Sequence, residues 1–190
     1  MFWKAKVATE SAPAMPARPF ALLQAIENRA RAVARGRNIG REAEKEWTGM
    51  AFRVASEIYI ADRNNIREIM TPVPLAPLPG AKSWLIGVAN VRGQLIPVTD
   101  LAAFAGLEPI QMSRTTRLIR INHDRNPVGL LVDEVRGFRR IHETEREATP
   151  RESALRAWIR GCYQVDRILC QHVDLHALVE STLFLDAAAG

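Results

Sequence analysis

Residues 84–101 read WLIGVANVRGQLIPVTDL, and this stretch decides the fold class of the chain. Two apolar runs flank the short segment NVRG. Glycine inside a strand pattern is typical of a bulge or a close backbone approach, and Asn tolerates the positive φ of a tight reversal. We therefore predict two buried strands joined by a turn within ANVRGQ, residues 89–94, to which Asn90 is suited and from which Arg92 projects. Gly87 and Gly93 bracket this segment.

Arg92 stands between two apolar strands, where an unpaired buried guanidinium is costly. Two interpretations are open. In one, the side chain extends over the core to water. In the other, it forms an ion pair at a crevice, and the preferred partner is Glu68, which also lies inside an apolar strand, between Ile66 and Ile69.

The pattern outside this stretch is also β-like from Thr48 onward. We predict a hairpin over 49–62 with Ser56 and Glu57 at its turn, a strand over 66–73, a hairpin over 116–138 that turns at Asp124, Asn126 and Pro127, and a hairpin over 155–175 that turns at Asp166. Four prolines in residues 72–79 exclude regular structure there. About nine or ten short strands with only small helices between them indicate an all-β barrel or sandwich.

A short internal similarity suggests two related halves. PVTDLAAFAG and QHVDLHALVE each place an Asp-Leu pair after a strand and before a short helix. Asp100 and Asp174 are therefore predicted to cap these helices by accepting backbone N–H groups.

The first 47 residues differ in composition from the rest. They hold nine Lys/Arg and five Asp/Glu, a balance of +4, whereas the remainder holds seventeen and sixteen, a balance of +1. We expect a disordered start over residues 1–18 and an amphipathic helix over 19–35, docked on the barrel or lying on a membrane surface. A second short helix is expected over 41–47. A domain over 48–184 and a flexible tail over 185–190 complete the expected organisation.

Composition excludes several classes of protein. The apolar fraction of 47% is enough for a core, and no apolar run is long enough to insert into a bilayer. Without a signal-peptide pattern, and with Cys162 and Cys170 expected as free thiols, we place the chain in the cytoplasm. A nearly neutral main domain weakens a nucleic-acid function.

Candidate reactive groups do not assemble into a catalytic or metal site. Cys170, His172, Asp174 and His176 alternate as on one strand face, but Asp174 is better used as a helix cap. Cys162 and Cys170 lie near His172 without a third orienting group. The charged run RGFRRIHETERE is expected to be a solvated strand edge rather than an anion-seeking patch. We expect no cofactor, no metal and no enzymatic activity.

The motif in 84–101 resembles the signature of the CheW family of chemotaxis coupling proteins, G-V-x-N-x-R-G-x-x-x-P-V-x-D-L. The positions that carry the resemblance are Gly87, Val88, Asn90, Arg92, Gly93, Pro97, Val98, Asp100 and Leu101. The similarity covers about residues 48–182, and the whole chain looks most like the branch that serves type IV pilus chemosensory systems. It implies two packed, SH3-like, five-stranded β-barrels.

The resemblance also implies a function. Such proteins are non-enzymatic adaptors, here expected to serve twitching motility, that link the cytoplasmic tip of a methyl-accepting chemoreceptor to the regulatory domain of a CheA-type histidine kinase. It implies that the chain is recruited to membrane-associated receptor arrays, and that Glu68 and Arg92 pair near the receptor-facing crevice, which Gly87, Asn90 and Gly93 help to shape. The alternative is a small β-barrel that binds nucleic acid through exposed aromatic and basic side chains.

Overall fold

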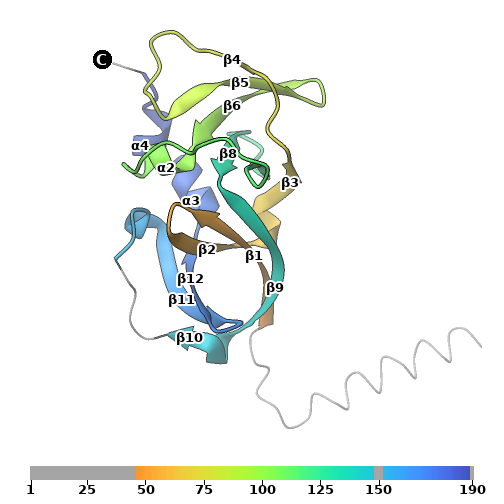
Figure 1. Ribbon diagram of the computed structural model, residues 1–190, viewed down its shortest axis with the longest axis vertical. Helices are drawn as coiled ribbons and strands as arrows, with labels where there is room; N and C mark the ends of the chain where they lie inside the picture. The colour runs from red at the N-terminus through yellow and green to blue at the C-terminus, as the bar shows by residue number, and fades with distance from the viewer. Residues whose placement is uncertain (1–45, 148–151, 189–190) are drawn as a thin grey trace, which may run out of the picture. The chain divides into compact units, whose positions relative to one another are not determined.

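The computed structural model describes residues 46–147 and 152–188 (Figure 1). The chain divides into two compact units, residues 1–43 and 44–190, and the described residues all belong to the second unit. The expected disordered start and the helix over 19–35 lie outside the described residues.

Strands dominate the described chain and form two six-stranded sheets. In order across the sheet, sheet A holds β10 (Arg146–Glu147), β11 (Ile159–Val165), β12 (Ile168–Val173), β2 (Glu57–Asp62), β1 (Glu46–Val54) and β9 (Glu134–His142). Sheet B holds β3 (Ile66–Met70), β7 (Arg117–Ile121), β8 (Gly129–Val132), β6 (Gln94–Asp100), β5 (Leu85–Val91) and β4 (Leu75–Ala76). The mainly β prediction is confirmed. The expected count of five strands per half holds only for the longer strands, because β4 and β10 add a two-residue strand to each sheet.

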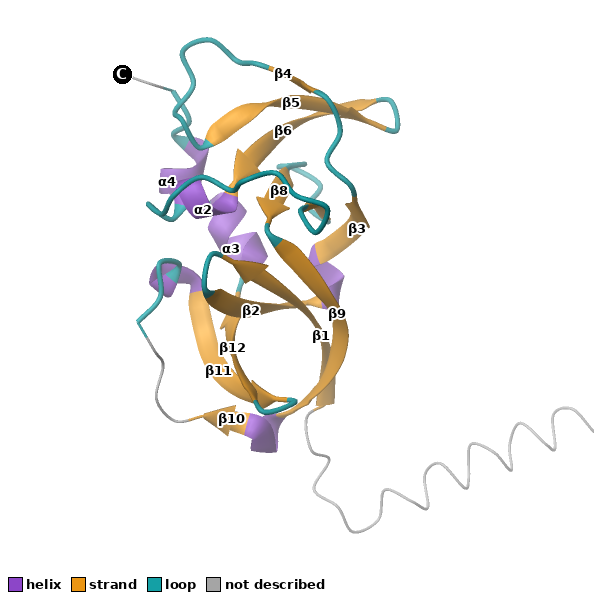
Figure 2. Ribbon diagram, viewed as in Figure 1, coloured by secondary structure: helices purple, strands orange, loops and turns teal. Residues whose placement is uncertain are grey.

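The two sheets share one pairing pattern. In sheet B, β6 pairs in parallel with β8 and antiparallel with β5; in sheet A, β12 pairs in parallel with β2 and antiparallel with β11. Continuing outward, β7 and β3 of sheet B occupy the places of β1 and β9 of sheet A. Figure 2 shows sheet B above and sheet A curving around the lower half. The described unit therefore consists of two halves with equivalent topology.

The sequence similarity between the halves extends over a whole hairpin. Residues 158–175 read WIRGCYQVDRILCQHVDL and align with residues 84–101 without a gap. In each segment the backbone N–H of the closing aspartate donates to the carbonyl of the opening tryptophan, at 2.8 Å for Asp100 and 2.9 Å for Asp174. The shared Asp-Leu pair is thus the end of an 18-residue repeat.

Both repeated hairpins reverse through two residues with positive φ. Arg92 (φ 51°) and Gly93 (φ 82°) form the turn in sheet B, and Asp166 (φ 50°) and Arg167 (φ 65°) form the turn in sheet A. The turn predicted within residues 89–94 is confirmed, but the residues with positive φ are Arg92 and Gly93 rather than Asn90. Asn90 belongs to β5, and its side-chain oxygen accepts the N–H of Gly93 at 2.9 Å.

Short helices and one core cluster that both sheets share join the sheets. The helices are α2 (Leu101–Phe104), α3 (Leu175–Glu180), α4 (Thr182–Leu185), and the 3₁₀ turns η1 (Arg63–Asn65), η2 (Glu143–Glu145) and η3 (Arg156–Trp158). The largest core cluster contains Phe52 and Tyr59 of sheet A together with Ile119 and Leu130 of sheet B. Because one cluster spans both sheets, the halves pack against each other through buried apolar side chains.

The chain differs from the predicted boundaries at both ends. Glu46 and Trp47 begin β1, so the helix expected over 41–47 is wrong where the structure describes it. Near the other end, the N–H of Lys82 donates to the carbonyl of Ala187 at 2.9 Å, and Lys82 Nζ lies 2.8 Å from Asp186 Oδ2. These contacts hold the segment that precedes residue 188 against the approach to β5, where the sequence predicts a flexible tail.

The proline-rich segment runs close to β5. The exclusion of regular structure in residues 72–79 is wrong for Leu75 and Ala76, which pair with β5 as β4. Gly87 makes this approach possible, because a Cβ at this position would lie 2.6 Å from the carbonyl oxygen of Ala76. Its φ of 149° is also a conformation that glycine alone adopts readily.

We expect Gly87→Ala to lower the free energy of unfolding by about 2 kcal/mol, because the new methyl group combines a backbone clash with an unfavourable φ. Gly93→Ala is the matched control, since Gly93 also has positive φ but has no neighbouring atom within 4 Å of an added Cβ. Chemical denaturation of both variants checks the difference. Equal losses would show that the approach of β4 has no energetic consequence.

Candidate partner-binding crevice

Glu68 on β3 lies between two arginines. Its Oε2 accepts a hydrogen bond from Arg92 Nε at 2.7 Å, and its Oε1 accepts one from Arg120 Nη1 at 3.0 Å. The side chains of Glu68 and Arg120 are 17% and 6% exposed, whereas that of Arg92 is 79% exposed. The expected ion pair between Arg92 and Glu68 is therefore present, and Arg92 also reaches solvent.

Sequence reasoning missed Arg120, the buried member of this cluster. Strand pairing places Arg120 of β7 opposite Glu68, and Arg120 Nη2 donates to Gln94 Oε1 at the start of β6. The signal was of the kind that singled out Arg92, because Arg120 stands between Ile119 and Ile121 in the apolar run RLIRI. The pairing of β3 with β7 joins segments 52 residues apart, so it could not be seen from local pattern.

The arginines hold Glu68 in its ionised form. Partial burial alone would raise the pKa of Glu68, but the hydrogen bond from Arg120 and the charge and hydrogen bond of Arg92 outweigh burial. The pKa of Glu68 consequently lies below its usual value.

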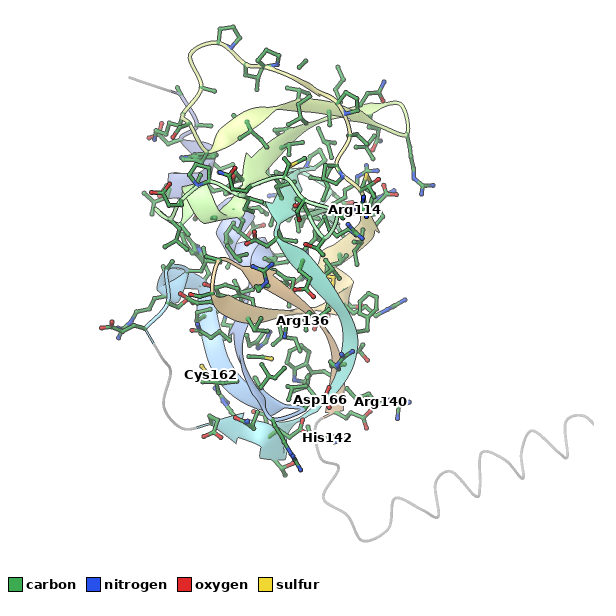
Figure 3. All side chains as sticks on the ribbon, viewed as in Figure 1. Arg114, Arg136, Arg140, His142, Cys162 and Asp166 are labelled. Carbon is green, nitrogen blue, oxygen red and sulfur yellow. The ribbon has the colours of Figure 1, made fainter. Side chains whose placement is uncertain are left out.

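The ion pair of Arg92 and Glu68 connects the two ends of sheet B. β3 stands at one end of the strand order and the β5–β6 hairpin lies toward the other end, so the pair of Arg92 and Glu68 links strands that share no backbone hydrogen bonds. Sheet A has a counterpart with reversed charges. Asp166, at the equivalent hairpin tip, accepts from Arg139 Nε of β9 at 2.9 Å (Figure 3 labels Asp166 at the lower end of sheet A).

A crevice lies beside Glu68, where β3 of sheet B meets β9 of sheet A. Its volume is about 470 Å³, and its lining residues are Arg63, Asn64, Ile66, Arg67, Glu68, Ile69, Asn122 and Phe138. Phe138 is 46% exposed, and the guanidinium carbon of Arg63 lies 5.9 Å from its ring centroid. An exposed aromatic ring among cations suits a protein surface that presents apolar and acidic side chains.

The predicted site residues take different positions around this crevice. Glu68 lines it directly, and Arg92 contacts Glu68 from the hairpin tip. Asn90 and Gly93 fix the backbone of that tip. Gly87 lies on β5, away from the tip, where β4 pairs with that strand. The structure thus brings the first two residues together at the crevice, while the other three shape the hairpin that carries Arg92.

Asp100 and Asp174 cap helices as predicted. Asp100 is buried, and its Oδ1 accepts the N–H groups of Ala102 and Ala103 at 3.0 Å each, while its Oδ2 accepts the N–H of Ile110 at 2.8 Å. Asp100 therefore fixes both the start of α2 and the loop after that helix.

The second cap combines a backbone bond with an ion pair. Asp174 Oδ1 accepts the N–H of Ala177 at 2.9 Å, and Asp174 Oδ2 lies 2.8 Å from Arg160 Nη2. Burial alone would raise the pKa of Asp174, but the Ala177 N–H and Arg160 outweigh it and lower that pKa. The alternating polar run is also engaged elsewhere, since His176 Nε2 bonds the carbonyl oxygen of Asn122 at 2.9 Å.

The two thiols are suited to packing rather than to nucleophilic chemistry. Cys162 and Cys170 are buried, and in the β11–β12 ladder they stand opposite Gln171 and Tyr163 rather than opposite each other. Burial raises the pKa of the Cys170 thiol to about 11, which keeps it protonated near neutral pH. Burial also lowers the pKa of His172.

Two further features bear on partner class. Phe138 is the one aromatic side chain among the large exposed hydrophobic residues of the described segments, so these segments lack the row of exposed rings that a single-stranded nucleic-acid platform uses. A helix of sufficient length and apolarity to cross a bilayer does not occur in the described part of the chain.

Comparison with known families decides the identity of the fold. The CheW-like domain family matches residues 48–183. The chain belongs to the CheW family. This family consists of non-catalytic adaptors, and the chain is a chemotaxis-type scaffold adaptor.

Individual CheW relatives support this placement. Protein PilI of Pseudomonas aeruginosa is 34% identical over 172 residues, which cover 90% of this chain and 96% of PilI. Chemotaxis protein CheW of Thermotoga maritima is 27% identical over 139 residues, covering 73% of this chain and 91% of that protein. Among solved structures, the scaffolding protein TtCheW from Thermoanaerobacter tengcongensis aligns with a TM-score of 0.63 and 27% identity, covering 72% of this chain and 94% of TtCheW.

Proposed function

We propose that this chain couples a methyl-accepting chemoreceptor to a CheA-type histidine kinase, and that it serves twitching motility through a type IV pilus chemosensory system. The observation that carries the proposal is the ion pair of Arg92 and Glu68 beside the exposed Phe138, at the junction of the two sheets. The similarity to PilI over 90% of the chain supports the pilus system over a flagellar one.

In this proposal the receptor tip occupies the crevice that Phe138 and Glu68 line. Arg92 is held beside the crevice by its bond to Glu68, and Gly87, Asn90 and Gly93 set the shape of the hairpin that presents it. The regulatory domain of the kinase binds a second surface, since an adaptor must hold both partners together. Binding to the receptor recruits the chain from the cytoplasm to membrane-associated arrays.

We expect Phe138→Asp to weaken receptor binding at least tenfold, because it replaces the exposed apolar ring of the crevice by a charge. Leu183→Asp on α4 is the matched control, since Leu183 is 66% exposed and lies in another element. Titration of a receptor-tip fragment into the full chain measures the effect. Equal losses of affinity in the two variants would contradict a receptor site at the crevice.

The coupling itself is tested by reconstitution. Adding the full chain to the kinase and receptor fragments should raise the rate of kinase autophosphorylation, and Phe138→Asp should abolish the increase. A chain that binds neither fragment, or that leaves the kinase rate unchanged, contradicts the proposed function. Binding to single-stranded DNA with a steep salt dependence would favour the nucleic-acid alternative.

A further inference from the structure

On one edge of the Arg120 guanidinium, only one of the two N–H donors forms a hydrogen bond in the described part of the chain. Away from this edge, Nη1 donates to Glu68. On the edge itself, Nη2 donates to Gln94 Oε1, while the buried Nε has no hydrogen-bond partner within the described residues. The Nε and Nη2 groups of an arginine point in parallel and match the two oxygens of a carboxylate. Here this two-donor edge meets a single oxygen of a neutral amide.

Gln94, which covers this edge of Arg120, lines a cavity. The cavity has a volume of about 410 Å³ and is lined by Arg67, Gln94, Leu95, Ile96, Arg120, Ile121, His123, Asp124 and Pro127. Gln94 is exposed at the start of β6, and its bond to Arg120 is the one side-chain hydrogen bond it makes in the described chain. A ligand that enters the cavity can therefore displace the Gln94 side chain without disturbing the core.

The charges around the cavity favour a single carboxylate. Among the lining residues, the two arginines Arg67 and Arg120 stand against the single carboxylate of Asp124, which leaves a surplus of one positive charge. Glu68 and Arg92 lie outside this lining and pair with each other. The ring nitrogens of the remaining titratable residue in the lining, His123, already bond the backbone N–H of residue 126 and the carboxylate of residue 180. A polyanion would meet the carboxylate of Asp124, whereas one Asp or Glu side chain balances the surplus.

An apolar contact lies beside the charged edge. Leu95 is 72% exposed and lines the same cavity as Arg120. An exposed leucine next to a desolvated cation fits a protein partner that presents an acidic residue with an apolar neighbour, because each contact excludes water from the other.

We propose that the Nε/Nη2 edge of Arg120 binds the carboxylate of an Asp or Glu side chain of the kinase regulatory domain, which displaces Gln94, while Leu95 contacts an apolar residue beside it. This inference rests on the proposed function. It assigns the kinase to this cavity because the receptor is assigned to the crevice at Phe138. Arg67 lines both the cavity and the crevice, so the two partners lie side by side on the adaptor. Glu68 remains bound to Arg120 Nη1 throughout, so the buried ion pair is kept.

Substitutions at Gln94 test this assignment without removing a buried charge. Gln94→Glu supplies a carboxylate from the chain itself, which should occupy the Arg120 edge and weaken binding of the kinase regulatory domain about tenfold or more. Gln94→Ala uncovers the edge and should bind within about threefold of the unmodified chain, or more tightly. Gln111→Glu is the matched control, because it makes the same chemical change at another exposed glutamine and should leave affinity unchanged.

The measurement is calorimetric titration of the full chain with the kinase regulatory domain, and in a second arm with the receptor-tip fragment. Equal affinities for Gln94→Glu and Gln111→Glu would overturn the inference. A loss in Gln94→Ala as large as in Gln94→Glu would also overturn it, because Gln94 would then be a contact residue itself. An effect confined to the receptor arm would overturn the assignment to the kinase. If the unmodified chain binds neither fragment, the proposed function fails and this inference fails with it.

A second readout follows Arg120 directly. In ¹H–¹⁵N spectra, the Nε–H resonance of Arg120 should shift when the kinase domain binds to the unmodified chain. Gln94→Glu alone should shift it in the same direction, because both place a carboxylate on Nε. An Nε–H resonance that does not respond to saturating kinase domain would contradict the proposal even if affinity changes.

Discussion

Glu68→Met and Arg120→Met should each lower the free energy of unfolding by about 3 kcal/mol. Glu68→Met leaves the buried Arg120 without its carboxylate partner, and Arg120→Met removes one of the two arginines that bond the half-buried Glu68. The double variant should lose less than the sum of the two, by about 1–3 kcal/mol, since it replaces the pair by two apolar side chains of similar length. Urea denaturation of the four proteins gives this coupling. Additive losses would mean that the 3.0 Å contact between Arg120 and Glu68 contributes nothing specific.

Arg92→Ala provides the control for this cycle. Arg92 bonds the same carboxylate at 2.7 Å, but its side chain is 79% exposed. Solvent-exposed ion pairs contribute about 0.2–1 kcal/mol, so Arg92→Ala should cost far less than Arg120→Met. A larger loss of stability for Arg92→Ala than for Arg120→Met would mean that the exposed arginine stabilises the fold more than the buried one.

The same cycle has a defined pH dependence. The pKa of Glu68 is lower in the folded chain than its usual value, so the unfolded chain binds a proton there more readily. The stability that Glu68 contributes is therefore present above the usual pKa of a glutamate and is lost as the pH falls through the lowered folded value. The difference between the unmodified chain and Glu68→Met should shrink in acid and stay constant near neutral pH.

Turns, helix caps and glycine positions depend on local sequence and could be predicted, whereas contacts that depend on strand pairing could not. The turn after NV, the helix caps at Asp100 and Asp174 and the need for glycine at position 87 depend on neighbouring residues or on backbone rules. The pairing of Glu68 with Arg92 could be predicted from two charges that each stand within an apolar run of the sequence. The same argument applies to Arg120, which also pairs with Glu68.

The errors have equally physical causes. Arg120 and Arg92 carry the same sequence signal, and only the pairing of β3 with β7 decides which one is buried. Asn90 has the intrinsic preference for positive φ, but its side chain caps the turn from within β5 while Arg92 adopts that backbone conformation. Phe138 lay in a run whose charges indicated an exposed edge, and β9 does stand at the end of sheet A. The run did not indicate that β9 also borders the crevice.

Asp100→Ala should destabilise the chain by about 3 kcal/mol, more than the loss of an ordinary helix cap. A lost cap costs about 0.5–2 kcal/mol, and an additional buried N–H without a partner costs about 1–3 kcal/mol. Both apply, because the carboxylate of Asp100 serves the first N–H groups of α2 through Oδ1 and the N–H of Ile110 through Oδ2. Thermal and urea denaturation measure the loss.

Asp100→Asn and Asp174→Ala separate these two contributions. An asparagine at position 100 keeps the oxygen that caps α2 but turns an NH₂ group toward the N–H of Ile110, so its loss should fall between zero and that of Asp100→Ala. Asp174 caps α3 through a single N–H, that of Ala177, and its other oxygen meets Arg160, whose side chain is 61% exposed. Asp174→Ala should therefore cost about 1 kcal/mol, the value of a cap with a solvent-screened ion pair. Equal losses for the two alanine variants would mean that the bond to Ile110 adds nothing, and that the two halves of the repeat use their aspartates in the same way despite the difference in burial.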